Sequence, residues 1–360
     1  MARTSWVVLA LALVGGPAAA QIDPNAAVLE RRAWEALNAG NARGAADAFR
    51  GALQGDPRNA RLHFGAGTAA YLERRDDDAK REFERALDLD PTLTDARVLL
   101  GQLLYRNSDL YGAIRVYERV VVDAPGDKRS AEALERWRRE AELHDRMRHS
   151  LNERFTVSFQ GPEEAELATQ ALTSLDRAYW RIGQELATFP NQPIAVVLYT
   201  TEQFRDITRS PAWAAAAYDG TIRVPVRGAL DNSKELDRVL AHEFTHALVR
   251  TLARNVPTWL NEGLAAALEN PDIDWARDRV RAAGEPMSLT TLRTSFQRLN
   301  GEQAQVAYAT SAIAVRRLLD ESGGLAITNL LRDLGEGVDF DQAFARRIQR
   351  PFASFQSELR

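Results

Sequence analysis

Three segments in the first half of the chain repeat with an offset of 34 residues. Pro57, Pro91 and Pro125 fall in register. The same offset aligns three alanines and three aromatic residues, which are Ala45, Ala79, Ala113, Phe49, Phe83 and Tyr117. A fixed period of this length is typical of stacked helix pairs, because one unit cannot bury its apolar face alone. The repeat therefore predicts an α-solenoid of three units over residues 26–127.

Small residues explain how the two helices of each unit can pack closely. Ala33, Gly67 and Gly101 share one position of the first helix, where a small side chain lets the second helix approach. The pattern resembles the tetratricopeptide repeat (TPR) family, in which Leu100-Gly101 is the usual pair and Arg32-Ala33 is the weakest match. The resemblance implies a scaffold that binds peptides or proteins. A purely structural or dimer-forming array is the alternative, because a repeat fold does not name its ligand.

The repeat is followed by a charged, helix-favouring segment, residues 128–150. A repeat stack needs a terminal helix with a polar outer face, so this segment is predicted to be a capping and linker helix. His144 and His149 lie among its charges and are expected to be solvated. His63 lies inside a repeat helix and is expected to be a packed or surface histidine.

Residues 1–20 have the pattern of a secretory signal peptide. Arg3 precedes the apolar run Trp6–Val14, and small residues end the segment at Ala20. A membrane-spanning helix needs about 20 apolar residues, which is far longer than this run. We therefore expect cleavage after Ala20 and a secreted or periplasmic protein without stable membrane insertion, with an uncleaved short anchor as the alternative.

Composition narrows the chemistry that is open to the chain. Cysteine is absent, so disulfides, thiolate nucleophiles and Cys-ligated zinc are excluded, and a metal site must use His, Asp and Glu. The formal net charge is −4, which gives no reason to expect a nucleic-acid partner. No Gly-rich phosphate-binding loop is found.

The second half of the chain has a different pattern. Alternation, apolar runs and helical spacing predict, in order, a strand, a helix and two strands at 155–159, 168–186, 194–200 and 221–226. Pro225 cannot donate to a ladder, so the last strand is expected at a sheet edge. Helical patterns continue from there to Arg360. Strands followed by helices predict an α+β domain over residues 155–360 in a mainly α protein.

The most informative motif is AHEFTHAL, residues 241–248. A residue four positions along a helix projects nearly over the first, so His242 and His246 can aim both imidazoles at one point. Glu243 lies about 100° round from His242 and can reach a water bound at that point without ligating the ion. Asn232 is expected to cap this helix.

A third ligand is needed, because catalytic zinc sites use three protein ligands and keep one position open. Glu262 lies in the stretch VPTWLNEGLAAALEN, in the first turn of a second helix that Thr258 is expected to cap. The chain between the two motifs is long enough for a turn that brings Glu262 back over the histidines.

Together, HEFTH and WLNEGLA resemble the gluzincin metallopeptidases, and residues 155–360 look like the peptidase MA-like domains that follow TPR arrays in bacteria. The resemblance implies a zincin-like domain with Zn²⁺ bound by His242, His246 and Glu262, and with Glu243 as general base. Tyr308, expected just before a helix, is the candidate oxyanion donor. A core tyrosine is nearly as good an interpretation of that residue.

These features predict an exported zinc metallopeptidase that hydrolyses peptide bonds, with a TPR array that recruits a substrate or a protein partner. Strand 221–226 is expected to run above the cleft and to bind an extended peptide as an added strand. The Gly-x-Met-Glu-Asn motif of the aminopeptidase branch is absent, which favours an endopeptidase. The alternatives are a TPR adaptor whose zincin domain binds zinc without cleaving, and a protease that its TPR array keeps inactive.

Overall fold

The computed structural model describes most of the chain after the predicted signal peptide. The described residues are 24–160, 163–200, 203–204, 207, 217–218, 220–225, 233–270, 272–294, 296 and 299–359. Residues 1–20 and the expected cap Asn232 lie outside them. Within the described part, no helix is both long enough and apolar enough to cross a membrane.

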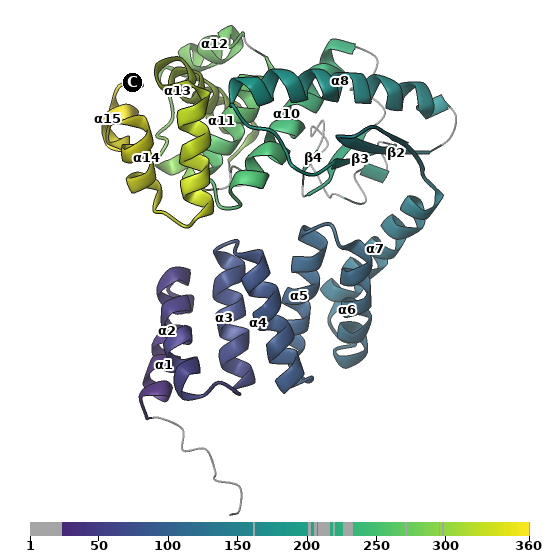
Figure 1. Ribbon diagram of the computed structural model, residues 1–360, viewed down its shortest axis with the longest axis vertical. Helices are drawn as coiled ribbons and strands as arrows, with labels where there is room; N and C mark the ends of the chain where they lie inside the picture. The colour runs from purple at the N-terminus through teal and green to yellow at the C-terminus, as the bar shows by residue number, and fades with distance from the viewer. Residues whose placement is uncertain are drawn as a thin grey trace, which may run out of the picture.

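The N-terminal half is a stack of helical hairpins (Figure 1). Its helices are α1 (Pro24–Asn38), α2 (Ala42–Gly55), α3 (Ala60–Leu72), α4 (Asp76–Leu89), α5 (Thr94–Arg106) and α6 (Leu110–Asp123). The aligned alanines and aromatic residues are all buried. A Cβ added to Gly67 would lie 2.7 Å from the ring of Phe83, and one added to Gly101 would lie 2.4 Å from the ring of Tyr117. The small residues therefore permit the close helix pairing that the sequence predicts.

Helix α7 (Lys128–Arg146) closes the stack, but it is shorter than the sequence predicts. Residues Arg148–Leu151 form strand β1, which pairs antiparallel with β2 (Phe155–Phe159). Three of the four β1 residues are exposed, so this short edge strand carries no apolar alternation to distinguish it from the charged helix before it. The sheet of the second half thus begins before residue 155.

The sheet is mixed and has the strand order β1-β2-β3-β5-β4. Strand β3 (Ile194–Tyr199) is parallel to β2 and to β5 (Ile222–Pro225), and helix α8 (Glu163–Glu185) joins β2 to β3. The predicted edge position of strand 221–226 is wrong, because β4 (Ala217–Tyr218) pairs outside β5. Among the described residues, β4 pairs with Ile222 and Arg223, and Pro225 pairs with Tyr199 of β3.

Helices follow the sheet, as the sequence predicts. They are α10 (Ser233–Leu252), α11 (Thr258–Glu269), α12 (Asp274–Ala283), the 3-10 turn η1 (Thr291–Arg293), α13 (Gly301–Gly335), α14 (Phe340–Ile348) and α15 (Phe352–Ser357). Helix α10 packs between α8 and α11, and α11 packs in turn against α13.

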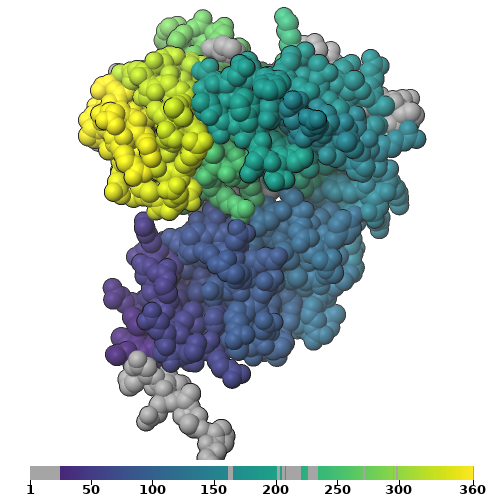
Figure 2. Space-filling view, in the orientation of Figure 1, coloured from purple at the N-terminus to yellow at the C-terminus, as the bar shows by residue number. Residues whose placement is uncertain are grey.

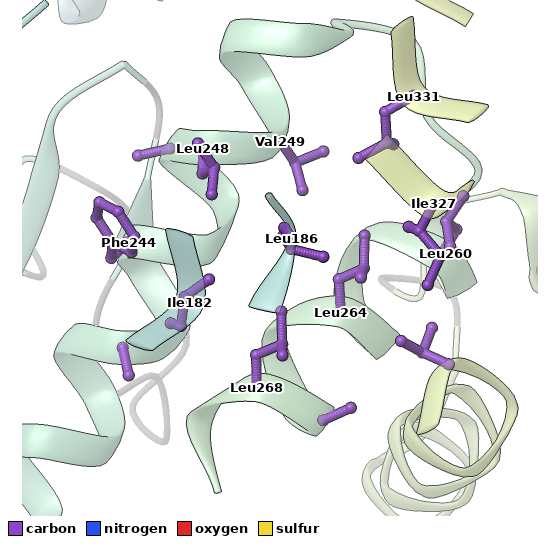
Figure 3. Close-up of a cluster of buried hydrophobic side chains, with 14 of the residues drawn as sticks. Ile182, Leu186, Phe244, Leu248, Val249, Leu260, Leu264, Leu268, Ile327 and Leu331 are labelled. Atoms are coloured by element: carbon purple, nitrogen blue, oxygen red, sulfur yellow. The ribbon is translucent and has the colours of Figure 1, made fainter. Parts of the chain in front are cut away.

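Figure 3 shows the core that joins these helices. It includes Phe244 and Leu248 from α10, and Leu264 from α11, all of which are fully buried. Burying an apolar side chain of this size contributes about 2 kcal/mol. The apolar faces of α10 and α11 therefore fix the relative position of two neighbouring helices.

One buried carboxylate near the C-terminus links α13 to α14. Arg346 and Arg347 donate through Nε to Asp333 at 3.0 and 2.8 Å. The hydrogen bond from Arg347 outweighs the effect of burial, and with Arg346 it lowers the pKa of Asp333 to about 2. The folded pKa lies below the usual value, so the stabilisation is full above pH ~4 and is lost as the pH falls towards 2.

The variant Asp333→Asn should therefore change how stability depends on pH. We expect a free energy of unfolding about 1 kcal/mol below wild type at pH 7, a value reduced for solvent screening because both arginines are partly exposed. Urea unfolding at pH 7 and at pH 2.5 checks this. The two proteins should converge at the lower pH, and a gap of equal size at both pH values would contradict the assignment.

A buried polar network joins the two halves of the molecule. Glu140 of α7 pairs with Arg223 of β5, and their side chains are 0% and 4% exposed. The Tyr105 hydroxyl donates to Glu140 at 2.9 Å, and Arg223 donates to the Tyr199 hydroxyl at 2.8 Å. His144 is not solvated as expected, because its Nε2 lies 2.7 Å from the same Tyr199 oxygen.

Candidate metal centre

Three side chains from two helices meet at one point. Helix α10 places His242 and His246 one turn apart, and α11 brings Glu262 to them. Oε2 of Glu262 lies 3.8 Å from Nε2 of His242 and 3.5 Å from Nε2 of His246. Within the described residues this is the one group of His, Asp and Glu side chains whose ligand atoms could hold a metal ion, all lying within 4.8 Å of one another.

The donor set fits zinc in type and spacing. Ligand atoms about 2.1 Å from a tetrahedral ion lie about 3.4 Å apart, which is close to the two distances between Glu262 and the histidines. Glu243 follows His242 on α10, and its Oε2 is buried with no hydrogen-bond partner among the described residues. An unpaired buried carboxylate oxygen beside a ligand triangle is suited to accept a proton from a bound water.

Close helix packing brings Glu262 into position. Residues 253–257 connect α10 to α11, and the N-cap of α11 is Pro257, so Thr258 is the first helical residue and not the cap. A Cβ added to Gly263 would lie 2.5 Å from the Ser311 carbonyl oxygen of α13. Only glycine permits this approach, which holds the first turn of α11 against α13.

In the ligand triangle, burial and neighbouring charges shift the pKa values of His246 and Glu262 in opposite directions. Burial lowers the pKa of His246, but the Glu262 carboxylate outweighs that effect and raises it to about 9. Burial would raise the pKa of Glu262, but His246 outweighs it and lowers the pKa below its ordinary value. These two shifts favour a proton on the His246 imidazole beside an ionised Glu262, and a metal ion bound there would displace that proton.

Glu243 differs from Glu262 in its electrostatics. Burial raises the pKa of the Glu243 carboxyl, and the imidazoles of His246 and His242 oppose that rise only in part. A carboxylate with a raised pKa holds a proton more readily than an ordinary one, as a group that must take and return a proton requires.

Tyr308 lies within α13, not before a helix as expected, because Asn300 caps α13 by a capping box with Gln303. Its side chain is partly buried and packs edge-on against Phe296, with ring centroids 5.4 Å apart. Its hydroxyl hydrogen-bonds the Glu262 side chain, and burial together with the carboxylates of Glu262 and Glu243 raises the pKa of that hydroxyl. The residue is therefore both a core tyrosine and a neighbour of the ligand triangle.

Glu269 is a residue of the centre that the sequence did not bring to attention. Its Oε2 lies 2.7 Å from Nδ1 of His242, and its Oε1 accepts from Arg238 at 2.7 Å. In the neutral tautomer that donates through Nδ1 to Glu269, Nε2 of His242 is the nitrogen available to a metal ion, and it lies 3.8 Å from Oε2 of Glu262. Glu269 stands seven residues after Glu262, two helical turns along the same face, and that spacing is the signal that could have found it.

Comparison with known families decides what this domain is. Residues 172–349 match the family model of the peptidase MA superfamily. These residues form a peptidase MA superfamily domain. The peptidase MA domain follows tetratricopeptide repeats, which are matched over residues 30–93 and 74–128. The predicted fold class is confirmed, since a mainly helical chain carries a TPR solenoid and then a peptidase MA domain with a small sheet.

Solved structures resemble the repeat half of the chain. One is the first TPR of Spaghetti (RPAP3) bound to the HSP90 peptide SRMEEVD, with 21% identity over 33% of this chain and 94% of that one, and a TM-score of 0.32. Another is the Sgt2 TPR domain from Aspergillus fumigatus, with 22% identity over 36% and 88% of the two chains and a TM-score of 0.33. The comparison with curated proteins gives no match.

Proposed function

We propose that the protein is an exported, zinc-dependent peptidase that hydrolyses peptide bonds and acts as an endopeptidase. The observation that carries the proposal is the triangle of His242, His246 and Glu262, with the unpaired buried oxygen of Glu243 beside it. The match to the peptidase MA superfamily supports a peptidase-like domain around that triangle.

His242 and His246 would hold the ion through Nε2, and Glu262 would hold it through Oε2. When bound, zinc lowers the pKa of its water to about 7 and polarises the substrate carbonyl. Glu269 keeps the His242 imidazole in the tautomer that this ligation needs.

Two side chains would take part in the reaction: Glu243 would transfer a proton, and Tyr308 would stabilise a negative charge. Glu243 accepts a proton from the attacking water at Oε2 and delivers it to the leaving amine nitrogen. The Tyr308 hydroxyl is protonated at neutral pH, as an ordinary tyrosine is, so it can donate a hydrogen bond to the oxyanion of the tetrahedral intermediate.

An extended substrate would bind as a strand beside β4, which is the outer strand next to β5 and packs against α10. This replaces the role expected of strand 221–226. The signal-peptide pattern of residues 1–20 supports export, and the repeats support recruitment of a peptide or protein partner.

A non-cleaving TPR adaptor is the competing function, and activity of the full chain separates the two. We expect about one zinc ion per chain, internal cleavage in a mixed peptide library, loss of cleavage with 1,10-phenanthroline and recovery after zinc is restored. A protein that holds zinc and cleaves no peptide, alone or with a TPR ligand, would favour the adaptor.

The variant Glu269→Gln should weaken zinc binding by about 10-fold or more, because the His242 imidazole loses its charged partner. Competition with a chromogenic chelator measures this affinity. Glu285→Gln, an exposed change of the same kind, is the control. Equal zinc affinity in Glu269→Gln and wild type would show that Glu269 is not needed to position the His242 imidazole.

A further inference from the structure

The spacing of the two histidines continues along the chain with two arginines. His242 and His246 are followed at the same interval of four by Arg250 and Arg254. Arg250 lies in the last turn of α10, and Arg254 lies in the loop 253–257 that leads to α11. The two histidines belong to the ligand triangle, whereas both arginines contact the TPR array.

Arg250 attaches the C-terminal end of α10 to the turn between α5 and α6. Its Nη2 donates to the carbonyl oxygen of Arg106 at 2.8 Å and to the side chain of Asn107 at 3.3 Å. The end of the helix that carries both histidines is therefore hydrogen-bonded to the third repeat unit.

Asp76 joins the repeats to the loop between the two ligand-bearing helices. Its carboxylate is 1% exposed, and its two oxygens take different arginines. Oδ1 accepts from Arg106 of the same array, and Oδ2 lies 2.8 Å from Nη1 of Arg254 in the peptidase MA domain. Arg106 therefore contacts both Asp76, through its guanidinium, and Arg250, through its backbone carbonyl.

The Asp76–Arg254 pair joins the loop to the TPR array at the edge of a cleft. A cleft of about 950 Å³, lined by the TPR turns, by residues 250–257 and by residues 334–340, lies beside the Asp76–Arg254 pair. Figure 2 shows a notch between the first repeats and the C-terminal helices, with contact between the two halves further along. Ala253 and Val256 of the same loop pack on the core of the peptidase MA domain, and the Asp76–Arg254 pair adds a polar contact with the repeats to that packing.

We propose that Asp76 is a positioning residue for the metal centre, so that the TPR array sets the geometry between the helix of His242 and His246 and the helix of Glu262. The inference rests on the proposed zinc site. It makes the repeats part of the peptidase centre, and a partner that displaces the α3–α4 turn would alter metal binding.

Two neighbouring aspartates distinguish the proposed positioning role of Asp76 from an effect on helix α4 alone. Asp76, Asp77 and Asp78 all lie in the first turn of α4, where acidic side chains favour the helix N-terminus. Asp78 pairs with Arg75 and Arg81 in its own repeat, and Asp77 is exposed. Asp77→Asn therefore removes the same helix-terminal charge and leaves the contact with Arg254 intact.

The test measures zinc and cobalt(II) binding to the full chain in Asp76→Asn, Arg254→Gln, Asp77→Asn and wild type. Zinc affinity comes from chelator competition, and the visible d–d spectrum of bound cobalt(II) reports ligand geometry without any need for activity. We expect affinities about 10-fold weaker and an altered cobalt spectrum in the first two variants, and wild-type behaviour in Asp77→Asn. Arg254→Gln keeps the Asp76–Arg106 pair, so it decides the matter if Asp76→Asn does not fold.

Unchanged zinc affinity and cobalt spectrum in Arg254→Gln would overturn the inference and leave the zinc site standing. A wild-type chain that binds neither metal would remove the zinc site and the inference together.

Discussion

Glu243→Gln is expected to lower kcat/KM for peptide cleavage by about 100- to 10,000-fold, the usual contribution of a general base. The amide has nearly the same shape, but it cannot take the proton of the attacking water. Zinc content should stay at the wild-type level, because Glu243 stands beside the ligand triangle and is not part of it.

Kinetics on a peptide that the wild type cleaves measure this effect, with zinc analysis of the same samples. Glu302→Gln, an exposed change at the start of α13, is the matched control and should keep full activity. Retained cleavage in Glu243→Gln would mean that another group accepts the proton.

Glu140→Gln is expected to destabilise the protein by about 3 kcal/mol, because the change removes a charged partner of the buried Arg223. Glu140 also accepts from the Tyr105 hydroxyl, so the change disturbs a hydrogen bond within the array as well. The loss should appear as a lower melting temperature and a lower urea midpoint.

Glu142→Gln removes the same charge from an exposed position of α7 and should change stability by less than about 0.5 kcal/mol. If the two variants melt together, the junction between α7 and β5 contributes little to stability. If Glu140→Gln alone melts early, the terminal TPR helix and the sheet stabilise each other.

The sequence predicted the elements that depend on residues close together in the chain. The offset of 34 residues fixed the helical hairpins, because each unit repeats the same small and aromatic positions, Gly67 with Phe83 among them. The spacing of His242 and His246 in a helix brought their imidazoles together, and one short loop was enough to return Glu262.

The elements that the sequence did not predict depend on contacts between distant segments. Strand β1 is short and exposed, so only its pairing with β2 distinguishes it from helix. The position of β4 outside β5 depends on a two-residue pairing that no pattern in the sequence predicts. Pro225 led to the wrong prediction that strand 221–226 lies at the sheet edge.

The inter-domain contacts show the same limit. Arg254 and Asp76 are far apart in sequence, and each looks like an ordinary surface charge until the fold brings them together. Glu269 is a different case, because its spacing from Glu262 was readable on one helix face and its partner His242 was already a candidate.

The most direct test of the account is a crystal structure of the zinc-loaded chain with anomalous data collected on both sides of the zinc absorption edge. We predict one strong peak about 2.0–2.2 Å from Nε2 of His242, Nε2 of His246 and a carboxylate oxygen of Glu262. A zinc peak elsewhere, or zinc bound without Glu262, would contradict the assignment on which the proposed peptidase chemistry rests.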